Sequence, residues 1–408
     1  MSGYDVSAVR SEFPILEHEV HGHPLVYLDN AATSQKPRAV LETSRRYYEE
    51  INSNIHRGTH HLSQQATASH ERARDIITSH LNAGSREEII FTAGATDSIN
   101  LVASILGYSG SIGPGDTIAI SNFEHHSNTV PWQMLCDRSG ARLEVVPVHE
   151  DGTLDLDAFH RVLEDREPKI VALSHISNAF GTILPVENLT EAAHRAGALV
   201  LIDGAQAIPH LTIDVQALNA DFYVFSGHKA YAPTGIGVLY GRRSLLDKLP
   251  PWRGGGEMIR KVDYAGTTYN DLPYKYEAGT PNIEGGIALG AAFEFLQGLN
   301  LDAVHRHETV LIEQAATALS SLKGVKLYGP PDRAGALSFN VEGIHHYDLG
   351  TLIDRMGVAV RTGHHCCQPL MARFGITGTL RASFACFNNE NDVQRLVAAV
   401  EKGTEMLR

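Results

Sequence analysis

Short apolar runs alternate with stretches of helical length between residues 88 and 240. In the longest stretches, apolar residues recur at helical spacing, as Ile99, Val102 and Ile105 do. The runs are almost continuously apolar, as in strands that are buried on both faces of a sheet. They are Glu88–Phe91, Thr117–Ile120, Leu143–Val146, Ile170–Leu173, Leu199–Ile202, Phe222–Phe225 and Ile236–Tyr240. This alternation predicts an α/β domain with a seven-stranded, mainly parallel sheet covered by helices.

The pattern changes after about residue 285 and predicts a smaller α+β domain at the C-terminal end. We expect helices near 285–296 and 301–322, strands at 335–341, 358–361 and 380–385, and a closing helix from Asn391. We therefore predict a large domain over residues 20–285 and a small domain over residues 286–408, joined by residues 1–19. Residues 250–282 form a Gly- and Pro-rich connection, and a loop of that length is usually functional or packed against a partner.

Composition and charge exclude several classes of protein. The chain has 408 residues, of which 43% are apolar and 20% charged, so it can form a large core without disulfide bonds. Its net charge of −13 argues against nucleic-acid binding and against a basic membrane-binding surface. The four cysteines form no disulfide scaffold. No signal sequence and no apolar stretch of about 18 residues is apparent, so we expect a cytoplasmic protein.

Polar clusters follow five of the predicted strands. In parallel sheets, ligands bind beyond the carboxyl ends of the strands, so these clusters predict one convergent site. The clusters are Gly94-Ala95-Thr96, Glu124-His125-His126, Ser177-Asn178, Asp203-Gly204-Ala205-Gln206 and Ser226-Gly227-His228-Lys229.

Two of these clusters carry a lysine and a carboxylate on neighbouring runs. Lys229 in a cleft suits Schiff-base chemistry, although a lone lysine is more often solvated. Asp203 alone is equally a helix cap or turn residue. Together they match pyridoxal phosphate, which needs a lysine for its aldehyde and an acid for its pyridine nitrogen. Thr96, at the start of a predicted helix, suits a phosphate group or a simple N-cap.

The C-terminal part adds a thiol and an arginine. Cys366 follows Arg361 and two histidines, which favour a thiolate, although a buried cysteine would be inert. Arg381 interrupts an apolar strand and needs an anion, either a substrate carboxylate or a structural ion pair. The histidine doublets match none of the usual zinc spacings, so we predict no metal site.

Taken together, the motifs resemble the cysteine desulfurases of group II, the SufS type, within the fold-type I pyridoxal-phosphate enzymes. The resemblance covers nearly the whole chain, and the short spacing from Cys366 to Arg381 favours group II over group I. It rests on the segments Tyr27–Thr33, His56–Gly58, Glu124–His126, Asp203–Gln206, Ser226–Lys229, Glu277–Asn282 and Arg361–Cys366.

The resemblance implies a role for each site residue. Lys229 would hold the cofactor covalently and act as a base, and Cys366 would accept sulfur as a persulfide. The cofactor ring would contact His125, Asp203 and Gln206, and either His125 or His126 would serve as a proton donor. The phosphate would contact Thr96, Ser226, His228 and, from the other subunit of a homodimer, Thr280. Asn178, Arg361 and Arg381 would hold the substrate, and Asn178 would also border the cofactor.

The implied reaction converts L-cysteine to L-alanine and passes the sulfur to an acceptor protein of the SufE or SufU type for iron–sulfur cluster assembly. A selenocysteine lyase, or another fold-type I enzyme such as an aminotransferase, is the alternative. Two departures from the family pattern are Ala95, where a threonine is expected, and Cys367, where a small unreactive residue is expected. Cys367 is inert or accepts the persulfide as a disulfide partner.

Overall fold

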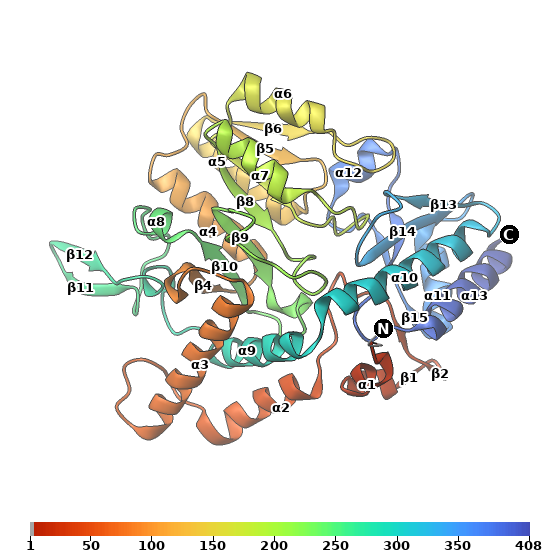
Figure 1. Cartoon of the computed structure of the whole chain (residues 1–408), viewed down its shortest axis with the longest axis horizontal. Helices are drawn as coiled ribbons and strands as arrows, with labels where there is room; N and C mark the ends of the chain where they lie inside the picture. Colours follow the sequence, from red (N-terminus) through yellow and green to blue (C-terminus); the bar gives the residue numbers. More distant parts are fainter. Residues whose placement is uncertain (1–3) are drawn as a thin grey trace.

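The computed structural model describes residues 4–408, and its largest sheet has seven strands (Figure 1). The strand order is β4-β10-β9-β8-β7-β5-β6, and only β10 runs antiparallel to its neighbours. The strands are β4 (Ile89–Thr92), β5 (Thr117–Ser121), β6 (Arg142–Val146), β7 (Ile170–Ser174), β8 (Leu199–Asp203), β9 (Phe222–Ser226) and β10 (Gly237–Gly241). The predicted seven-stranded, mainly parallel sheet is confirmed.

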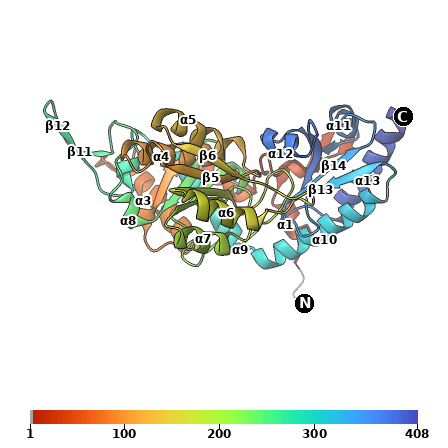
Figure 2. The same cartoon turned by 90° about the horizontal axis from the view of Figure 1, so that it is seen from above.

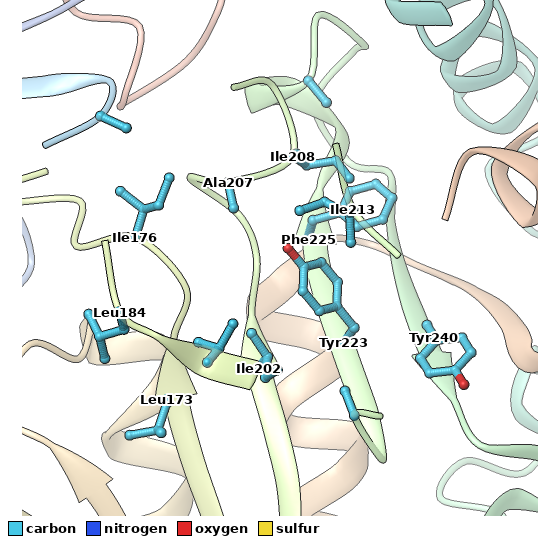
Figure 3. Packing of buried hydrophobic residues seen from close by; sticks show 14 of the residues in the cluster. Leu173, Ile176, Leu184, Ile202, Ala207, Ile208, Ile213, Tyr223, Phe225 and Tyr240 are labelled. Atoms are coloured by element: carbon cyan, nitrogen blue, oxygen red, sulfur yellow. The ribbon is translucent and has the colours of Figure 1, made fainter. Parts of the chain in front are cut away.

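Helices cover both faces of this sheet, which explains why its strands are apolar at successive positions. In β9, Phe222 and Val224 pack in the core on the side of α4, whereas Tyr223 and Phe225 pack in the core on the opposite side (Figure 3). One face is covered by α4 (Ala95–Tyr108), α5 (Val130–Ser139) and α8 (Arg243–Leu246). The other is covered by α3 (His61–His80), α6 (Leu156–Arg166), α7 (Val186–Arg195) and α9 (Ile283–Gly298).

A second, antiparallel sheet lies at the other end of the molecule (Figure 2). Its order is β13 (Val325–Tyr328), β14 (Ala336–Val341), β17 (Thr379–Ser383) and β16 (Arg361–Gly363). Its core contains residues of α10 (Leu301–Ser320), α11 (His346–Arg355) and α13 (Glu390–Leu407). The prediction missed β13. It also merged β16 with β15 (Val358–Ala359), which instead pairs with β3 (Val26–Tyr27).

The chain termini and α9 bear on the predicted domain division. Near the N-terminus, α1 (Val6–Ser11) contacts the C-terminal part, where Arg10 forms an ion pair of 2.9 Å with Asp392. The helix α9 begins at Ile283 and packs against α2 (Arg38–Arg46) and α3, so it belongs with the large sheet. The boundaries at residues 19/20 and 285/286 stay a prediction.

The sequence predicts a loop over residues 250–282. In the structure this connection instead contains a two-stranded hairpin. Its strands β11 (Ile259–Asp263) and β12 (Gly266–Tyr269) project from the body of the molecule (Figures 1 and 2). A second small hairpin joins β1 (Glu19–Val20) to β2 (His23–Pro24). Within residues 4–408, no single helix is long and apolar enough to span a membrane, and α9 and α10 meet that test only as a pair bent by 79°.

Candidate active site

A cavity of about 230 Å³ lies where the large sheet meets the C-terminal part. Five strands of the large sheet, β4, β5, β7, β8 and β9, deliver residues to it from their carboxyl ends, so the predicted convergence is found. The lining residues are Ala31, Ala32, Ala95, Thr96, His125, Ser127, Asn178, Asp203, Ala205, Ser226, His228, Lys229, Arg361, His365, Cys366 and Arg381.

Lys229 and Asp203 form the charged floor of the cavity. Lys229 ends a short 3-10 turn directly after β9, and Asp203 is the last residue of the adjacent strand β8. Burial lowers the pKa of Lys229, with Asp203 opposing the shift and Arg381 adding to it. Burial also raises the pKa of Asp203, against the effect of Lys229. The two groups therefore sense each other's charge in a poorly solvated place, as the sequence argument required.

The turn between β4 and α4 forms an anion-binding corner. Gly94 has φ of +151° there, and a Cβ at this position would come within 3.1 Å of Ser226 Oγ, so the close approach requires glycine. The Ala95 N–H donates to Ser226 Oγ at 2.8 Å, and Thr96 Oγ1 lies 2.6 Å from Ser127 Oγ. Three hydroxyl groups, those of Thr96, Ser127 and Ser226, are thus held at the N-terminus of a long helix, where the dipole favours an anion.

His125 is supplied by the segment after β5, which is held by its neighbour Glu124. The buried Glu124 carboxylate accepts hydrogen bonds from Ser174 N (3.0 Å), Ser174 Oγ (2.7 Å) and Asn128 Nδ2 (2.6 Å). Burial raises the pKa of Glu124 to about 7. Burial, followed by the charge of Lys229, lowers the pKa of His125 to about 3. The His125 ring is therefore neutral at pH 7, as suits contact with a flat apolar surface.

Two arginines face the cavity from the C-terminal sheet. Arg381, on β17, is fully buried and donates through Nη1 to the Asn178 carbonyl (2.8 Å) and through Nη2 to Asp29 Oδ1 (3.1 Å). Its Nε has no partner within the described part of the chain. Arg361 is half-exposed, and its Nη1 lies 3.7 Å from Asp29 Oδ2. Two cations share one carboxylate, so an anionic ligand would complete the charge balance.

The two adjacent cysteines have opposite environments. Cys366 lines the cavity and has φ of +57°, an unusual backbone conformation for a residue other than glycine. Its N–H donates to His364 Nδ1 (3.1 Å), and its carbonyl accepts from His126 N (2.8 Å). Cys367 is fully buried and does not line the cavity. Of the two adjacent cysteines, only Cys366 therefore lies at the cavity.

The chain belongs to a known family. A comparison with family models matches residues 26–396 to "Aminotransferase class-V". This chain is a member of that family. A probable cysteine desulfurase of Vibrio cholerae is 48% identical over 403 residues, covering 99% of both chains, and a cysteine desulfurase of Serratia proteamaculans is 48% identical over 405 residues, also covering 99% of both.

Solved structures agree with this assignment. The cysteine desulfurase CsdA (S-sulfonic acid) from Escherichia coli has 40% sequence identity, a TM-score of 0.92 and coverage of 99% of both chains. The cysteine desulfurase from Thermococcus onnurineus NA1 has 38% identity and a TM-score of 0.90, covering 96% of this chain and 98% of the other. The predicted fold-type I architecture and the enzyme class, a pyridoxal-phosphate-dependent cysteine desulfurase, are confirmed.

The residues of the cavity themselves fit pyridoxal phosphate. A lysine and a carboxylate border the floor, and a neutral imidazole is available for the ring. The glycine at position 94 leaves room beside Ser226 at a helix N-terminus, where Thr96 and Ser127 supply two further hydroxyl groups. The unpartnered Nε of the buried Arg381 still offers a donor to a carboxylate.

Two predicted cofactor residues lie outside the cavity lining. Gln206 donates its amide to the Ala31 carbonyl at 2.9 Å, and its expected contact with the ring hydroxyl stays a prediction. Thr280 borders two other cavities, together with Gly279 and Pro281. That position agrees with the expectation that it serves another subunit, which stays a prediction.

The sequence argument also missed some site residues. Asp29 received no role, although it stands within the quoted Tyr27–Thr33 motif and links Arg361 to Arg381. Ser127 and His365 were likewise not singled out. An acidic residue within a recognised motif was the available signal. Among residues 4–408, no group of three or more His, Cys, Asp or Glu side chains is arranged to hold a metal ion.

Proposed function

We propose that this chain releases sulfur from L-cysteine through a persulfide on Cys366, as a cysteine desulfurase of the SufS-type group II. The observation that carries the proposal is that Lys229 and Cys366 line one cavity, with Arg381 at its wall. A base, a nucleophile and a carboxylate clamp are the three groups that this reaction needs. The segment after Cys366 supports group II, because α12 (Gln368–Arg373) begins two residues later and leaves no long loop before Arg381.

The residues that would hold the cofactor follow from the cavity. Lys229 would bind its aldehyde, Asp203 would pair with its pyridine nitrogen, and His125 would contact its ring. Thr96, Ser226 and His228 would hold its phosphate, and the second subunit of a homodimer would contribute Thr280. When bound, pyridoxal phosphate draws electrons from the α-carbon of the substrate.

The residues of the chain then carry the reaction. Arg381 and Arg361 bind the carboxylate of L-cysteine, and Asn178 borders the bound substrate. Lys229 removes the α-proton. The Cys366 thiolate attacks the substrate sulfur, so that an S–S bond forms while the substrate Cβ–S bond breaks and its electron pair stays with the carbon skeleton. Proton return gives L-alanine and leaves the persulfide on Cys366.

The persulfide needs an acceptor beyond the cavity. Cys366 is half-buried at the cavity wall, so a protein thiol can approach it from outside. We propose an acceptor of the SufE or SufU type, iron–sulfur cluster assembly as the use of the sulfur, and a cytoplasmic location. The position of Thr280 outside the cavity of its own subunit supports the homodimer.

The decisive experiment separates cofactor binding from sulfur release. The Cys366→Ala variant should keep its visible cofactor absorption but lose sulfur release from L-cysteine by about 10³-fold, the scale expected when a positioned nucleophile is removed. Borohydride reduction of the wild-type holoenzyme should fix the cofactor on the peptide that contains Lys229. Undiminished sulfur release by the Cys366→Ala variant would refute the role of this thiol.

Two other reactions would give different results in the same assay. A selenocysteine lyase would release selenium from selenocysteine and leave L-cysteine almost unreacted. An aminotransferase would consume a keto acid and would not depend on Cys366. Measuring alanine and sulfide with and without a keto acid distinguishes the three activities.

A further inference from the structure

The second cysteine of the pair points into the protein, toward Asn178. Cys367 is fully buried, and its Sγ lies 3.0 Å from Asn178 Oδ1 and 3.7 Å from the Phe123 carbonyl oxygen. Both neighbours are acceptors, so the thiol acts as the donor. Burial raises the pKa of Cys367, so the sulfur retains the proton that this hydrogen bond requires.

Asn178 uses its other amide atom to hold the backbone beside the nucleophile. Its Nδ2 donates to the His365 carbonyl at 2.7 Å, while its own backbone carbonyl accepts from Arg381 Nη1 at 2.8 Å. A flipped amide would set its NH₂ group against the Cys367 thiol and its oxygen against the His365 carbonyl. The thiol donor and the His365 carbonyl therefore favour the same orientation of the Asn178 amide, the one that can hold residue 365.

The Asn178 amide holds a backbone conformation that is unfavourable for residues other than glycine. His365 and Cys366 have φ of +53° and +57°, two consecutive left-handed residues that are not glycine. Such conformations persist only where surrounding contacts impose them. Three hydrogen bonds hold this segment. Asn178 Nδ2 donates to the His365 carbonyl, and His126 N donates to the Cys366 carbonyl (2.8 Å). The third joins His365 Nε2 to Thr379 Oγ1 (2.8 Å).

We propose that Cys367 is a positioning residue for desulfuration, whose thiol orients Asn178 so that the amide holds the left-handed backbone directing Cys366 into the cavity. This inference rests on the proposed function of Cys366 and adds a residue that contacts neither substrate nor cofactor. It also assigns Cys367 a role other than sulfur carrier, because its thiol faces a protein amide and not the cavity.

The test compares Cys367→Ala with Cys367→Ser in the holoenzyme, by measuring alanine formation from L-cysteine. The alanine variant should lose about tenfold in kcat, the value of one hydrogen bond, with cofactor absorption unchanged. The serine variant keeps a donor and should recover most of that loss. The matched control is Cys386→Ala, which removes another fully buried thiol outside the cavity and should leave kcat unchanged.

A double-mutant cycle tests whether Cys367 acts through Asn178. In an Asn178→Ala background, Cys367→Ala should cause no further loss, because residues in one hydrogen-bond chain are not additive. A wild-type kcat for Cys367→Ala, a serine variant no better than the alanine variant, or additive losses would each overturn the proposal. So would persulfide found on Cys367 by peptide mass mapping. Absence of alanine formation by the wild-type enzyme would instead refute the proposed function.

Discussion

Two fully buried arginines show how a structural ion network differs from a binding site. Arg74, on α3, donates five hydrogen bonds, to Glu71, Glu277 and the Ile89 carbonyl. Arg381, at the cavity, donates two, and its Nε is unpartnered within residues 4–408. Both guanidinium groups are equally removed from solvent, so burial alone does not distinguish their roles.

The difference lies in how completely each cation is satisfied. All five donors of Arg74 are used by the protein, so this cation keeps no free donor for a ligand. Arg381 shares the carboxylate of Asp29 with Arg361 and keeps a donor in reserve. A buried arginine with unused donors beside a cavity is therefore a candidate for binding a carboxylate ligand. Variants in the two regions should separate activity from stability.

The largest effect is expected at Arg381. The Arg381→Lys variant keeps the charge but loses the forked donor arrangement, and two charge-assisted hydrogen bonds are worth about 4 kcal/mol, or about 10³-fold in kcat/KM. Steady-state kinetics with L-cysteine measures this loss, and thermal unfolding should change little. Unaltered kcat/KM would mean that Arg381 serves the fold alone.

Glu277 should show the opposite behaviour. It accepts from Arg74 Nη1 (2.7 Å), Arg74 Nη2 (2.9 Å) and Phe91 N (2.7 Å). The Glu277→Gln variant leaves a buried cation poorly paired, and the free energy of unfolding should fall by about 3 kcal/mol. Denaturant unfolding of the holoenzyme measures it, while kcat per folded molecule stays close to wild type. A large loss of kcat without loss of stability would contradict the assignment of Glu277 to a structural ion network.

The pH dependence of stability should report on Glu71 in the same network. Burial by itself would raise its pKa, but the hydrogen bond with His56 and the charge of Arg74 lower the pKa of Glu71 to about 2. A depressed carboxyl pKa stabilises the fold above the unfolded value of 4.5 and loses that contribution as the pH falls toward 2. Glu71→Gln should lower the free energy of unfolding by about 2 kcal/mol at pH 7. This value already includes a reduction for the partial exposure of the Glu71 side chain.

Unfolding of the Glu71→Gln variant at pH 7 and at pH 3 checks this prediction. The difference from wild type should shrink at pH 3, because the unfolded chain binds a proton at Glu71 below its pKa of 4.5, whereas the folded protein keeps the carboxylate ionised until the pH nears 2. An equal difference at both pH values would show that the side chain acts through packing and not through its charge.

The smallest effect is expected at an exposed pair near the same helices. Arg72 Nη2 lies 2.8 Å from Glu294 Oε1, and both side chains are solvent-accessible. Glu294→Gln should change the free energy of unfolding by less than about 1 kcal/mol, as exposed ion pairs usually do. It is therefore the matched control for Glu277→Gln, measured under the same conditions. A loss of unfolding free energy as large as that of Glu277→Gln would show that burial does not explain the effect of the Glu277 variant.

The elements of the large sheet were predictable because each carries its own local signal. The seven apolar runs are short, nearly continuous and separated by helical spacing, and all seven became strands. The hairpin β11–β12 was missed because its residues are largely exposed and lack such a run, and β13 was missed because Lys326 interrupts its short, partly buried apolar run. Exposed strands are held by backbone pairing, which leaves little trace in side-chain pattern.

The site was predictable in part for the same reason. Lys229 and Asp203 stand directly after apolar strands, and parallel strands bring their carboxyl ends to one edge. The hydrogen bond from Gln206 to the Ala31 carbonyl could not be predicted, because it joins segments 175 residues apart. The link from Asp29 to Arg381 spans 352 residues and has no local signature.

The amino-acid sequence by itself determined the parallel sheet, the edge at which the chemistry gathers, and the pairing of a lysine with a carboxylate, since these depend on local periodicity and strand direction. The tertiary structure alone decided how the backbone holds Cys366 at the cavity and which donors of a buried arginine remain unused. Those properties depend on left-handed backbone at residues 365 and 366 and on contacts between distant segments. Short-range patterns carry no information about either.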